Sequence, residues 1–334
     1  MKFLRYILFP IVPIYFLVTW TRNKLYDFGW KKSKSYSFPV ICVGNLSVGG
    51  TGKSPMIEYL IRLLKTDYKL ATLSRGYKRE TDGFKLANAT DSAKTLGDEP
   101  FQFYNKFGED IFVAVDASRL NGIENLQSLN NKPDVILLDD AFQHRKVQAG
   151  FNILLTAYGD LYCNDFVLPT GNLREPKSGA KRAHVIVVTK CPIGLSSQEK
   201  EQIEMKLHSE ANQLVFFSSI NYSKEVISAT KNVSLTDLKP FTLVTGIANP
   251  SPLIAYLKMN KLEFKHLNFK DHHSFSEKEL ANLAKLECIL TTEKDYMRLK
   301  DNIQLKDKLF YLPIEVSIDN PEVFNKEILN FVRT

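Results

Sequence analysis

The sequence predicts an α/β fold of the P-loop type, in which a doubly wound parallel sheet is followed by a second, smaller α/β domain. Three observations lead to this prediction. Seven apolar, β-prone runs recur along the first two thirds of the chain, with helical stretches between them. The runs are continuous rather than alternating, as expected of strands buried on both faces of a parallel sheet. A glycine-rich turn followed by Lys-Ser joins the first run to a helix start.

The N-terminal segment differs from the rest of the chain. Residues 1–35 contain seven basic residues and one acidic residue, so they hold +6 of the formal net charge of +7. Residues 6–20 carry no charge, and aromatic and basic residues follow them. This pattern predicts a membrane-associated helix, residues 1–35, on an anionic surface. The run is shorter than the roughly 20 residues of a span, and Pro10 and Pro13 interrupt it. The alternative is a hydrophobic first helix packed on the protein's own core.

The remaining 299 residues carry a net charge of only +1. They show no basic stripe with interleaved aromatic residues, which disfavours nucleic acid as a partner. The four cysteines are far apart, and no C-x-x-C pair occurs. We therefore expect no zinc site, and a reducing compartment fits the cysteine usage best.

The predicted nucleotide-binding domain covers residues 36–235. Its strands are expected at residues 39–44, 69–73, 111–115, 134–139, 151–156, 185–189 and 214–218, and residues 55–66 and 100–107 are among the expected helices. The composition turns polar near residues 232–240, and a second alternation then begins. It predicts strands at 241–246, 263–268, 288–292 and 309–316 and helices at 252–259, 277–286 and 321–332. These elements form the predicted smaller domain, residues 236–334, which closes a cleft.

Residues 47–54 read S-V-G-G-T-G-K-S. They match the last three positions of the phosphate-loop pattern G-x-x-x-x-G-K-[ST], with serine in place of the first glycine. Lys53 is expected to reach the β- and γ-phosphates of ATP and to act in catalysis, and the Ser54 hydroxyl to contact Mg²⁺. The expected nucleotide-binding residues are Ser47, Val48, Gly49, Gly50, Thr51, Gly52, Lys53 and Ser54. The alternative is a glycine-rich turn without a ligand.

Asp139 and Asp140 end the apolar run at residues 134–139. A carboxylate at the end of a buried strand, beside a phosphate loop, is the usual position for a ligand of nucleotide-bound Mg²⁺. Two adjacent acids would also repel each other without a cation. Both aspartates are therefore candidates for the metal contact, and the sequence does not separate them. An ordinary solvated turn is the alternative.

Eight motifs together resemble one family. They are residues 39–55, S-R-G-Y at 74–77, G-D-E-P at 97–100, D-D-A-F-Q-H at 139–144, L-R-E-P at 173–176, G-I-A-N-P at 246–250, D-H-H-S-F at 271–275 and T-E-K-D at 292–295. They occur in the order seen in tetraacyldisaccharide 4'-kinases, and they cover nearly the whole chain. Ala141 stands where that family usually has glycine, and Ser54 where it more often has threonine.

The resemblance implies a P-loop kinase-like fold of two α/β/α domains with the active site in the cleft. It also implies transfer of the γ-phosphate of ATP to the 4'-hydroxyl of a tetraacyl glucosamine disaccharide 1-phosphate. The product is the 1,4'-bisphosphorylated lipid A precursor, lipid IVA. The implied location is the cytoplasmic face of the bacterial inner membrane, with the acylated lipid and the anionic membrane surface as partners and no obligate protein partner.

The resemblance also implies a catalytic pair, Asp98 as proton acceptor and His272 as the residue that orients it. A helix cap is the alternative reading of Asp98. Arg75, Arg119 and Arg174 are candidate substrate contacts, because the planar guanidinium donates two parallel hydrogen bonds to phosphate. Gln143 and His144 follow the acidic pair and are expected to face the cleft as further substrate contacts.

Two other functions remain open on the residues alone. One is a P-loop kinase or ligase for a soluble metabolite, which would have no use for an aromatic and basic N-terminal anchor. The other is a nucleotide-driven switch or ATPase, whose guanine-reading form needs an N-K-x-D element that the sequence lacks.

Overall fold

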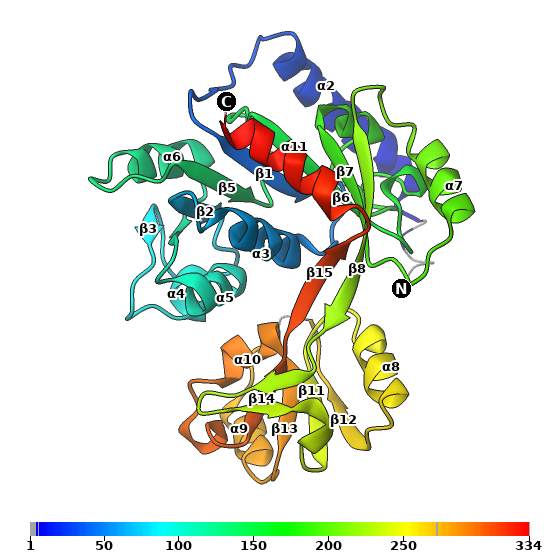
Figure 1. The fold of residues 1–334 in the computed structure, drawn as a ribbon. Coiled ribbons are helices and arrows are strands. Elements are labelled where there is room, and N and C mark those ends of the chain that lie inside the picture. The colour runs from blue at the N-terminus through cyan, green and yellow to red at the C-terminus, as the bar shows by residue number, and fades with distance from the viewer. Residues whose placement is uncertain (1–4, 6, 272, 334) are drawn as a thin grey trace.

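The computed structural model describes residues 5, 7–271 and 273–333. Within them the chain forms two mainly parallel sheets with helices on their faces (Figure 1). This architecture confirms the α/β class predicted from the continuous apolar runs. The N-terminal helix lies at the end of the molecule that holds the larger sheet, and the smaller sheet lies at the opposite end (Figure 1).

The larger sheet has nine strands within the described residues, in the order β15-β8-β7-β6-β1-β5-β2-β4-β3. The strands from β8 to β4 in this order run parallel, and the edge strands β15 and β3 pair antiparallel. Every residue of β1 is buried, because helices cover both faces of the sheet. The strands are β1 (Val40–Asn45), β2 (Leu70–Ser74), β3 (Lys85–Leu86), β4 (Phe112–Val115), β5 (Val135–Asp139), β6 (Phe151–Ala157), β7 (Val185–Thr189), β8 (Leu214–Tyr222) and β15 (Ile314–Ile318).

Two hydrophobic clusters lie on the two faces of this sheet. One packs Ile57, Phe103 and Phe324 of three different helices against the strands. The other includes Leu126 and Leu207. The helices of the first cluster are α3 (Lys53–Leu64), α5 (Asp98–Phe107) and α11 (Pro321–Arg333); those of the second are α6 (Arg119–Gln127) and α7 (Ser197–Leu207); α4 (Ala93–Leu96) is a single turn before α5.

The smaller sheet has the order β10-β9-β14-β13-β11-β12, and the four strands from β14 to β12 are parallel. Its elements are β9 (Glu225–Ile227), β10 (Asn232–Ser234), β11 (Phe241–Thr245), α8 (Ser251–Met259), β12 (Phe264–Asn268), α9 (Glu277–Leu283), β13 (Ile289–Thr292), α10 (Glu293–Leu299) and β14 (Leu309–Leu312). The short 3₁₀ helices are η1 (Phe9–Ile11), η2 (Tyr162–Asn164), η3 (Lys177–Arg182), η4 (Leu235–Asp237) and η5 (Ile303–Leu305).

The end of the chain returns to the larger sheet. The sequence predicts one strand over residues 309–316, and this prediction is wrong. The run divides at Pro313 into β14, in the smaller sheet, and β15, in the larger one. Proline lacks the N–H that continues a ladder, so it suits the point where a chain leaves one sheet for another. Both β15 and α11 therefore pack on the larger sheet, although a boundary after residue 235 assigns them to the smaller domain.

The N-terminal segment forms η1 and then α2 (Val12–Asp27). Pro13 lies in the first turn of α2, where its missing N–H costs no hydrogen bond. Val12 is the only buried apolar residue in α2, and the side chains of Ile14 and Val18 are 64% and 62% exposed. This exposure disfavours the alternative of a core helix. Among the residues that the structure describes, no helix is both long enough and apolar enough to cross a bilayer.

Candidate active site

The phosphate loop, residues 47–54, connects the buried strand β1 to the first turn of α3. Gly49 and Gly52 have φ angles of +113° and +86°, which side chains disfavour, so glycine suits these two positions. Two neighbouring segments hold the loop. The Val48 N–H donates to the Asn172 carbonyl at 2.7 Å, and Thr189 Oγ1 donates to the Thr51 carbonyl at 2.8 Å. The loop thus presents a helix N-terminus, which is a ready anion site.

Lys190, which follows β7, is a second cation at this loop. Its ammonium donates to the Gly50 carbonyl. Burial and the neighbouring Lys53 lower the pKa of Lys190. The two ammonium groups therefore lie in one electropositive region, as expected where triphosphate binds. Lys190 was not predicted from the sequence, because a single lysine after a strand matches no nucleotide-binding motif.

Asp139 ends β5, and its carboxylate is 3% exposed. Ser74 Oγ donates to Asp139 Oδ2 at 3.2 Å, but Oδ1 is buried without a hydrogen-bond partner among the described residues. Burial, Glu99 and Asp140 together raise the pKa of Asp139 to about 7. A buried carboxylate oxygen without a donor is a position that a bound cation would satisfy.

Asp140 has a different environment. Arg174 Nη1 donates to both of its oxygens, at 2.9 and 3.0 Å, and Lys53 Nζ lies 3.7 Å from Oδ1. Burial opposes ionisation of Asp140, but Lys53 and Arg174 outweigh it and the pKa is lowered. Asp140 is therefore an anion that links the loop lysine to Arg174, whereas Asp139 has the vacant oxygen. The two aspartates, equivalent in the sequence, thus have different surroundings.

The other predicted substrate contacts lie around this pair in unequal positions. Arg119 is 2% exposed, and it donates to the carbonyls of Asp116 and Asp139 at 3.0 Å each. This burial favours a supporting role for Arg119 over the substrate contact expected from the sequence. Gln143 Nε2 donates to the Asn45 carbonyl and to Glu175, at 2.8 and 2.9 Å, so its amide is held by the protein.

His144 and Arg75 are the remaining predicted contacts. Burial, Arg119 and Lys146 lower the pKa of His144 to about 4, so its imidazole is neutral at pH 7. Its Nε2 is buried without a hydrogen-bond partner among the described residues. Arg75 follows β2 and is exposed, so its guanidinium can reach a ligand.

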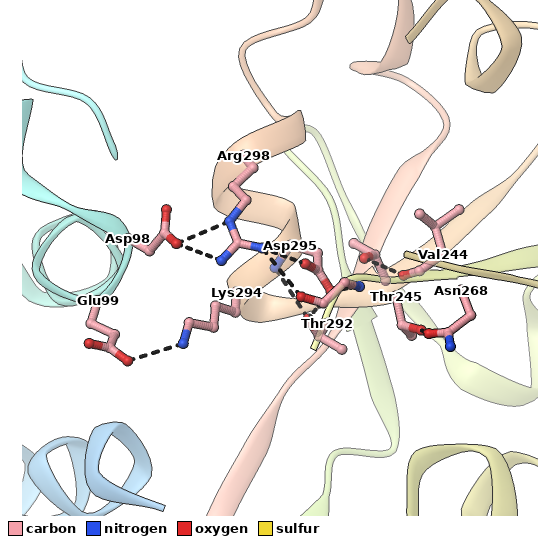
Figure 2. Close-up of polar contacts among 11 residues, drawn as sticks. Asp98, Glu99, Val244, Thr245, Asn268, Thr292, Lys294, Asp295 and Arg298 are labelled. Atoms are coloured by element: carbon pink, nitrogen blue, oxygen red, sulfur yellow. Dashed lines mark hydrogen bonds and ion pairs between the residues drawn. The ribbon is translucent and has the colours of Figure 1, made fainter. Parts of the chain in front are cut away.

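Helix α5 of the larger sheet packs against helix α10 of the smaller one (Figure 2). Glu99, in the first turn of α5, acts to raise the pKa of Asp139, so this contact adjoins the acid pair. Asp98, the first residue of α5, accepts from Arg298 Nη2 at 2.5 Å and from Nε at 3.1 Å. Beside it, Lys294 Nζ donates to Glu99 at 3.0 Å (Figure 2). His272, the predicted partner of Asp98, lies outside the described residues. Glu99 and Arg298 had no role assigned from the sequence, and Lys294 was expected either to close on the nucleotide with its neighbours in the T-E-K-D motif or to lie in a solvated turn.

Two acids of the T-E-K-D motif at the start of α10, Asp295 and Glu293, accept hydrogen bonds from different parts of the chain. Asp295 is fully buried; it accepts from the Gly246 N–H at 2.8 Å and from Arg298 at 3.0 Å. Glu293 accepts from Lys106 Nζ at 2.7 Å, and Lys106 also donates to Glu58 of α3 at 2.6 Å. One lysine therefore joins the helix that follows the phosphate loop to the smaller sheet.

These residues fit a Mg²⁺ ion that is shared with a nucleotide. Among the described residues no group of three or more histidine, cysteine or acidic side chains could hold a metal alone. Mg²⁺ in nucleotide sites takes one or two carboxylates and completes its shell with phosphate oxygens and water. Asp139 supplies the unpartnered oxygen. Glu99 is a second carboxylate, near enough to raise the pKa of Asp139. Ser54, which follows the loop lysine, supplies a hydroxyl.

Comparison with known proteins gives one consistent result. The profile of the LpxK family, tetraacyldisaccharide-1-P 4'-kinase, matches residues 4–333. The chain is 53% identical to a tetraacyldisaccharide 4'-kinase of Flavobacterium johnsoniae, over all of this chain and 98% of that one. It is 43% identical to the enzyme of the same name from Phocaeicola vulgatus, over 98% and 94% of the two chains. A crystal structure of LpxK from Aquifex aeolicus in complex with ATP has a TM-score of 0.78 and 30% identity, over 98% and 99% of the two chains.

Proposed function

The chain belongs to the tetraacyldisaccharide-1-P 4'-kinase family, so it phosphorylates the 4'-position of a tetraacyldisaccharide with ATP in lipid A biosynthesis, and we propose which of its residues do so. The observation that carries this assignment is the junction of β1, β5 and α5. There Lys53 of the phosphate loop lies beside Asp140, and the neighbouring Asp139 has an oxygen without a hydrogen-bond partner among the described residues. Glu99, which follows the Asp98 that Arg298 holds, acts to raise the pKa of Asp139.

The nucleotide-binding residues are the backbone of residues 47–54 and the ammonium of Lys53. The loop directs a helix N-terminus to the triphosphate, and Lys53 offsets the charge of its terminal groups. Lys53 Nζ lies 3.7 Å from Asp140 Oδ1. A bound triphosphate would replace Asp140 as the anionic partner of Lys53. The ammonium therefore has an anionic partner in either case, although its site is largely buried.

The metal-binding residues are Asp139 and Ser54, with Glu99 as a further carboxylate. The vacant Oδ1 of Asp139 favours this residue over Asp140, which already has Arg174 and Lys53. A bound Mg²⁺ ion would neutralise charge that develops on the β- and γ-phosphate oxygens. Asp139 must lose its proton to bind a cation, and its raised pKa makes that step dependent on pH.

The proton acceptor is Asp98. A sugar hydroxyl is a weak nucleophile, and its proton must pass to a base within hydrogen-bond reach. The location of Asp98 at the start of α5, beside Glu99 and against α10, supports this role. Arg298 fixes the orientation of the carboxylate by donating two hydrogen bonds to it. His272 is proposed as a second orienting group from the smaller sheet.

The lipid substrate is proposed to approach along α2. Tyr15 OH donates to the Arg174 carbonyl at 3.0 Å, and Arg22 donates to the Gln143 carbonyl at 2.8 Å, so the helix lies against the segments that carry the acid pair. Arg174 and Arg75 are the candidate contacts for the substrate's phosphate and sugars. Gln143, His144 and Arg119 would support them from behind.

The exposed apolar side of α2 supports peripheral binding to the cytoplasmic face of the inner membrane. Ile14, Leu17 and Val18 are each more than half exposed, and Arg5, Arg22 and Lys24 flank them in the sequence. Such a helix lies in the headgroup layer with its apolar side toward the acyl chains. The substrate's acyl chains could then remain in the bilayer while its sugars enter the site.

The decisive test combines transfer and binding. Purified protein is given γ-labelled ATP, Mg²⁺ and a tetraacyldisaccharide 1-phosphate, and labelled lipid is separated by thin-layer chromatography. We expect Asp98→Asn to lower kcat by roughly 10²- to 10⁴-fold with ATP binding retained. Lys53→Ala should lose ATP binding as well. Asp307→Asn, an exposed aspartate of the smaller unit, is the control. Phosphate release that ignores the lipid would instead indicate a nucleotide-driven switch.

A further inference from the structure

A basic pocket lies between η2, η3 and the C-terminal end of α7. Its volume is about 500 Å³. Lys177, Lys181, Lys206 and His208 line it, and the described residues contribute no carboxylate to its wall. None of the residues assigned above to phosphate transfer lines this pocket. Its charge therefore needs a separate explanation.

Two of the pocket's lysines, Lys177 and Lys206, lie near one thiol in its wall, that of Cys163. Lys177 Nζ donates to the Cys163 carbonyl at 2.6 Å. Burial raises the pKa of the Cys163 thiol, and Lys177 and Lys206 both act against that rise, so both ammonium groups lie near the same thiol. Glu210 pairs with Lys181 at 2.8 Å, outside the pocket wall. The remaining cations favour an anion as the occupant.

The pocket is continuous with the apolar surface of the N-terminal segment. The Lys177 ammonium lies 5.8 Å from the centre of the Phe166 ring, and Phe166 is 55% exposed. Phe166 packs edge-to-face on Phe9, with the ring centres 6.4 Å apart. Arg5 ties the segment to the same loop, because its guanidinium donates to Asn172 at 2.9 Å and to the Gly171 carbonyl at 3.0 Å.

We propose that this pocket binds the phosphodiester headgroup of an anionic membrane phospholipid. Phosphate oxygens accept from Lys177 and Lys206, while the exposed rings of Phe9 and Phe166 lie against the adjoining acyl chains. Lysines beside an exposed apolar surface are the combination that attracts proteins to anionic leaflets. The pocket is thus a second membrane contact beside α2, and two contacts fix the orientation of the protein on the surface. This inference rests on the membrane binding proposed for α2.

The test measures binding of the full chain to vesicles of phosphatidylcholine with and without phosphatidylglycerol. Lys177→Gln/Lys206→Gln should weaken binding to phosphatidylglycerol vesicles by roughly 30-fold, since each lysine near an anionic surface contributes roughly fivefold. Ser178→Glu keeps every lysine but adds a carboxylate to the pocket wall, and it should weaken the same binding. Lys258→Gln/Lys278→Gln removes two exposed lysines of the smaller unit and should leave binding unchanged.

Phosphate transfer in detergent micelles should be unchanged in all three variants, which also shows that they fold. Equal binding of wild type, Lys177→Gln/Lys206→Gln and Ser178→Glu to phosphatidylglycerol vesicles would overturn the pocket assignment. So would saturation of the pocket by inorganic phosphate with no loss of vesicle binding. A different result would refute the membrane binding proposed for α2. In that case Ile14→Glu/Leu17→Glu would bind both kinds of vesicle as well as the wild type does.

Discussion

Arg298, on helix α10 of the smaller sheet, donates from Nη2 to Oδ2 of Asp98, the first residue of α5, at 2.5 Å. The same guanidinium donates from Nη1 to the buried Asp295 at 3.0 Å. One arginine therefore fixes two acids, one on each side of the boundary between the sheets. The carboxylate that we propose as the base has its orientation set by the unit that does not hold the nucleotide, so a movement of the smaller sheet would also move the base's partner.

Arg298→Met removes this link. We expect kcat to fall roughly 10- to 100-fold, because Asp98 loses its orienting partner, with little change in the KM for ATP. Arg298→Lys keeps the positive charge but not the planar guanidinium with its several donors, so it should recover only part of the lost kcat. Steady-state kinetics with both substrates measures the effect, and Arg333→Met, at the exposed end of α11, is the control. A variant whose only defect is weaker ATP binding would argue against this role.

The raised pKa of Asp139 predicts that the nucleotide-free protein loses stability as pH rises. The unfolded aspartate is already ionised at pH 6, whereas the folded one, with a pKa of about 7, still holds its proton. Between pH 6 and 8 the folded state must release that proton, which costs about 1.4 kcal/mol of the free energy of unfolding. Denaturant unfolding at the two pH values, without nucleotide or metal, measures the loss.

Asp139→Asn should reduce that pH dependence, because the amide does not titrate. The variant should be at least as stable as the wild type at pH 8 while losing phosphate transfer. Burial and Glu58 also raise the pKa of Glu293 to about 7. Glu293 therefore continues to contribute to the pH dependence of stability in this variant. Asp307→Asn should leave the wild-type pH dependence intact. An identical pH dependence in Asp139→Asn and the wild type would show that this carboxyl is not the source.

Lys106 holds two buried acids of different helices, Glu58 and Glu293, which are 2% and 6% exposed. Lys106→Met removes the cation that pairs with Glu293 and leaves Glu58 with Arg62, at 3.2 Å, as its partner. We expect a loss of roughly 3–5 kcal/mol in the free energy of unfolding. Adding Glu58→Gln and Glu293→Gln to this variant should recover most of it, since no buried charge then remains unpaired. Unfolding curves of the single and triple variants decide the matter; equal losses in both would mean that Lys106 acts through packing alone.

The exposed apolar side of α2 can be tested without disturbing the core. Ile14→Glu/Leu17→Glu should lower vesicle binding at least tenfold, because both side chains are mostly exposed and a charge in the headgroup–acyl boundary is costly. Stability in solution should change little. Met259→Glu alters an equally exposed apolar residue on α8 of the smaller sheet, and it should bind vesicles normally. Co-sedimentation with vesicles measures both variants.

The sequence alone was sufficient for the parts of this protein that depend on local pattern. The α/β class, the strand before the phosphate loop and the acid pair at the end of β5 follow from apolar runs and glycine spacing, because burial on both faces of a parallel sheet demands continuous apolar strands. The strand predicted at 309–316 was the exception. Its apolar pattern continues through Pro313, and only the pairing partners show that the chain changes sheets there.

The tertiary structure alone decided how the site's charges are divided. Asp139 and Asp140 are neighbours of the same type, yet one has a vacant oxygen and a raised pKa while the other is paired with Arg174 and Lys53. Asp98 and Arg298 are 200 residues apart in the chain and meet through α5 and α10. An ion pair and a pKa depend on distance and burial, which arise only when remote segments pack together, so no local pattern of residues encodes them.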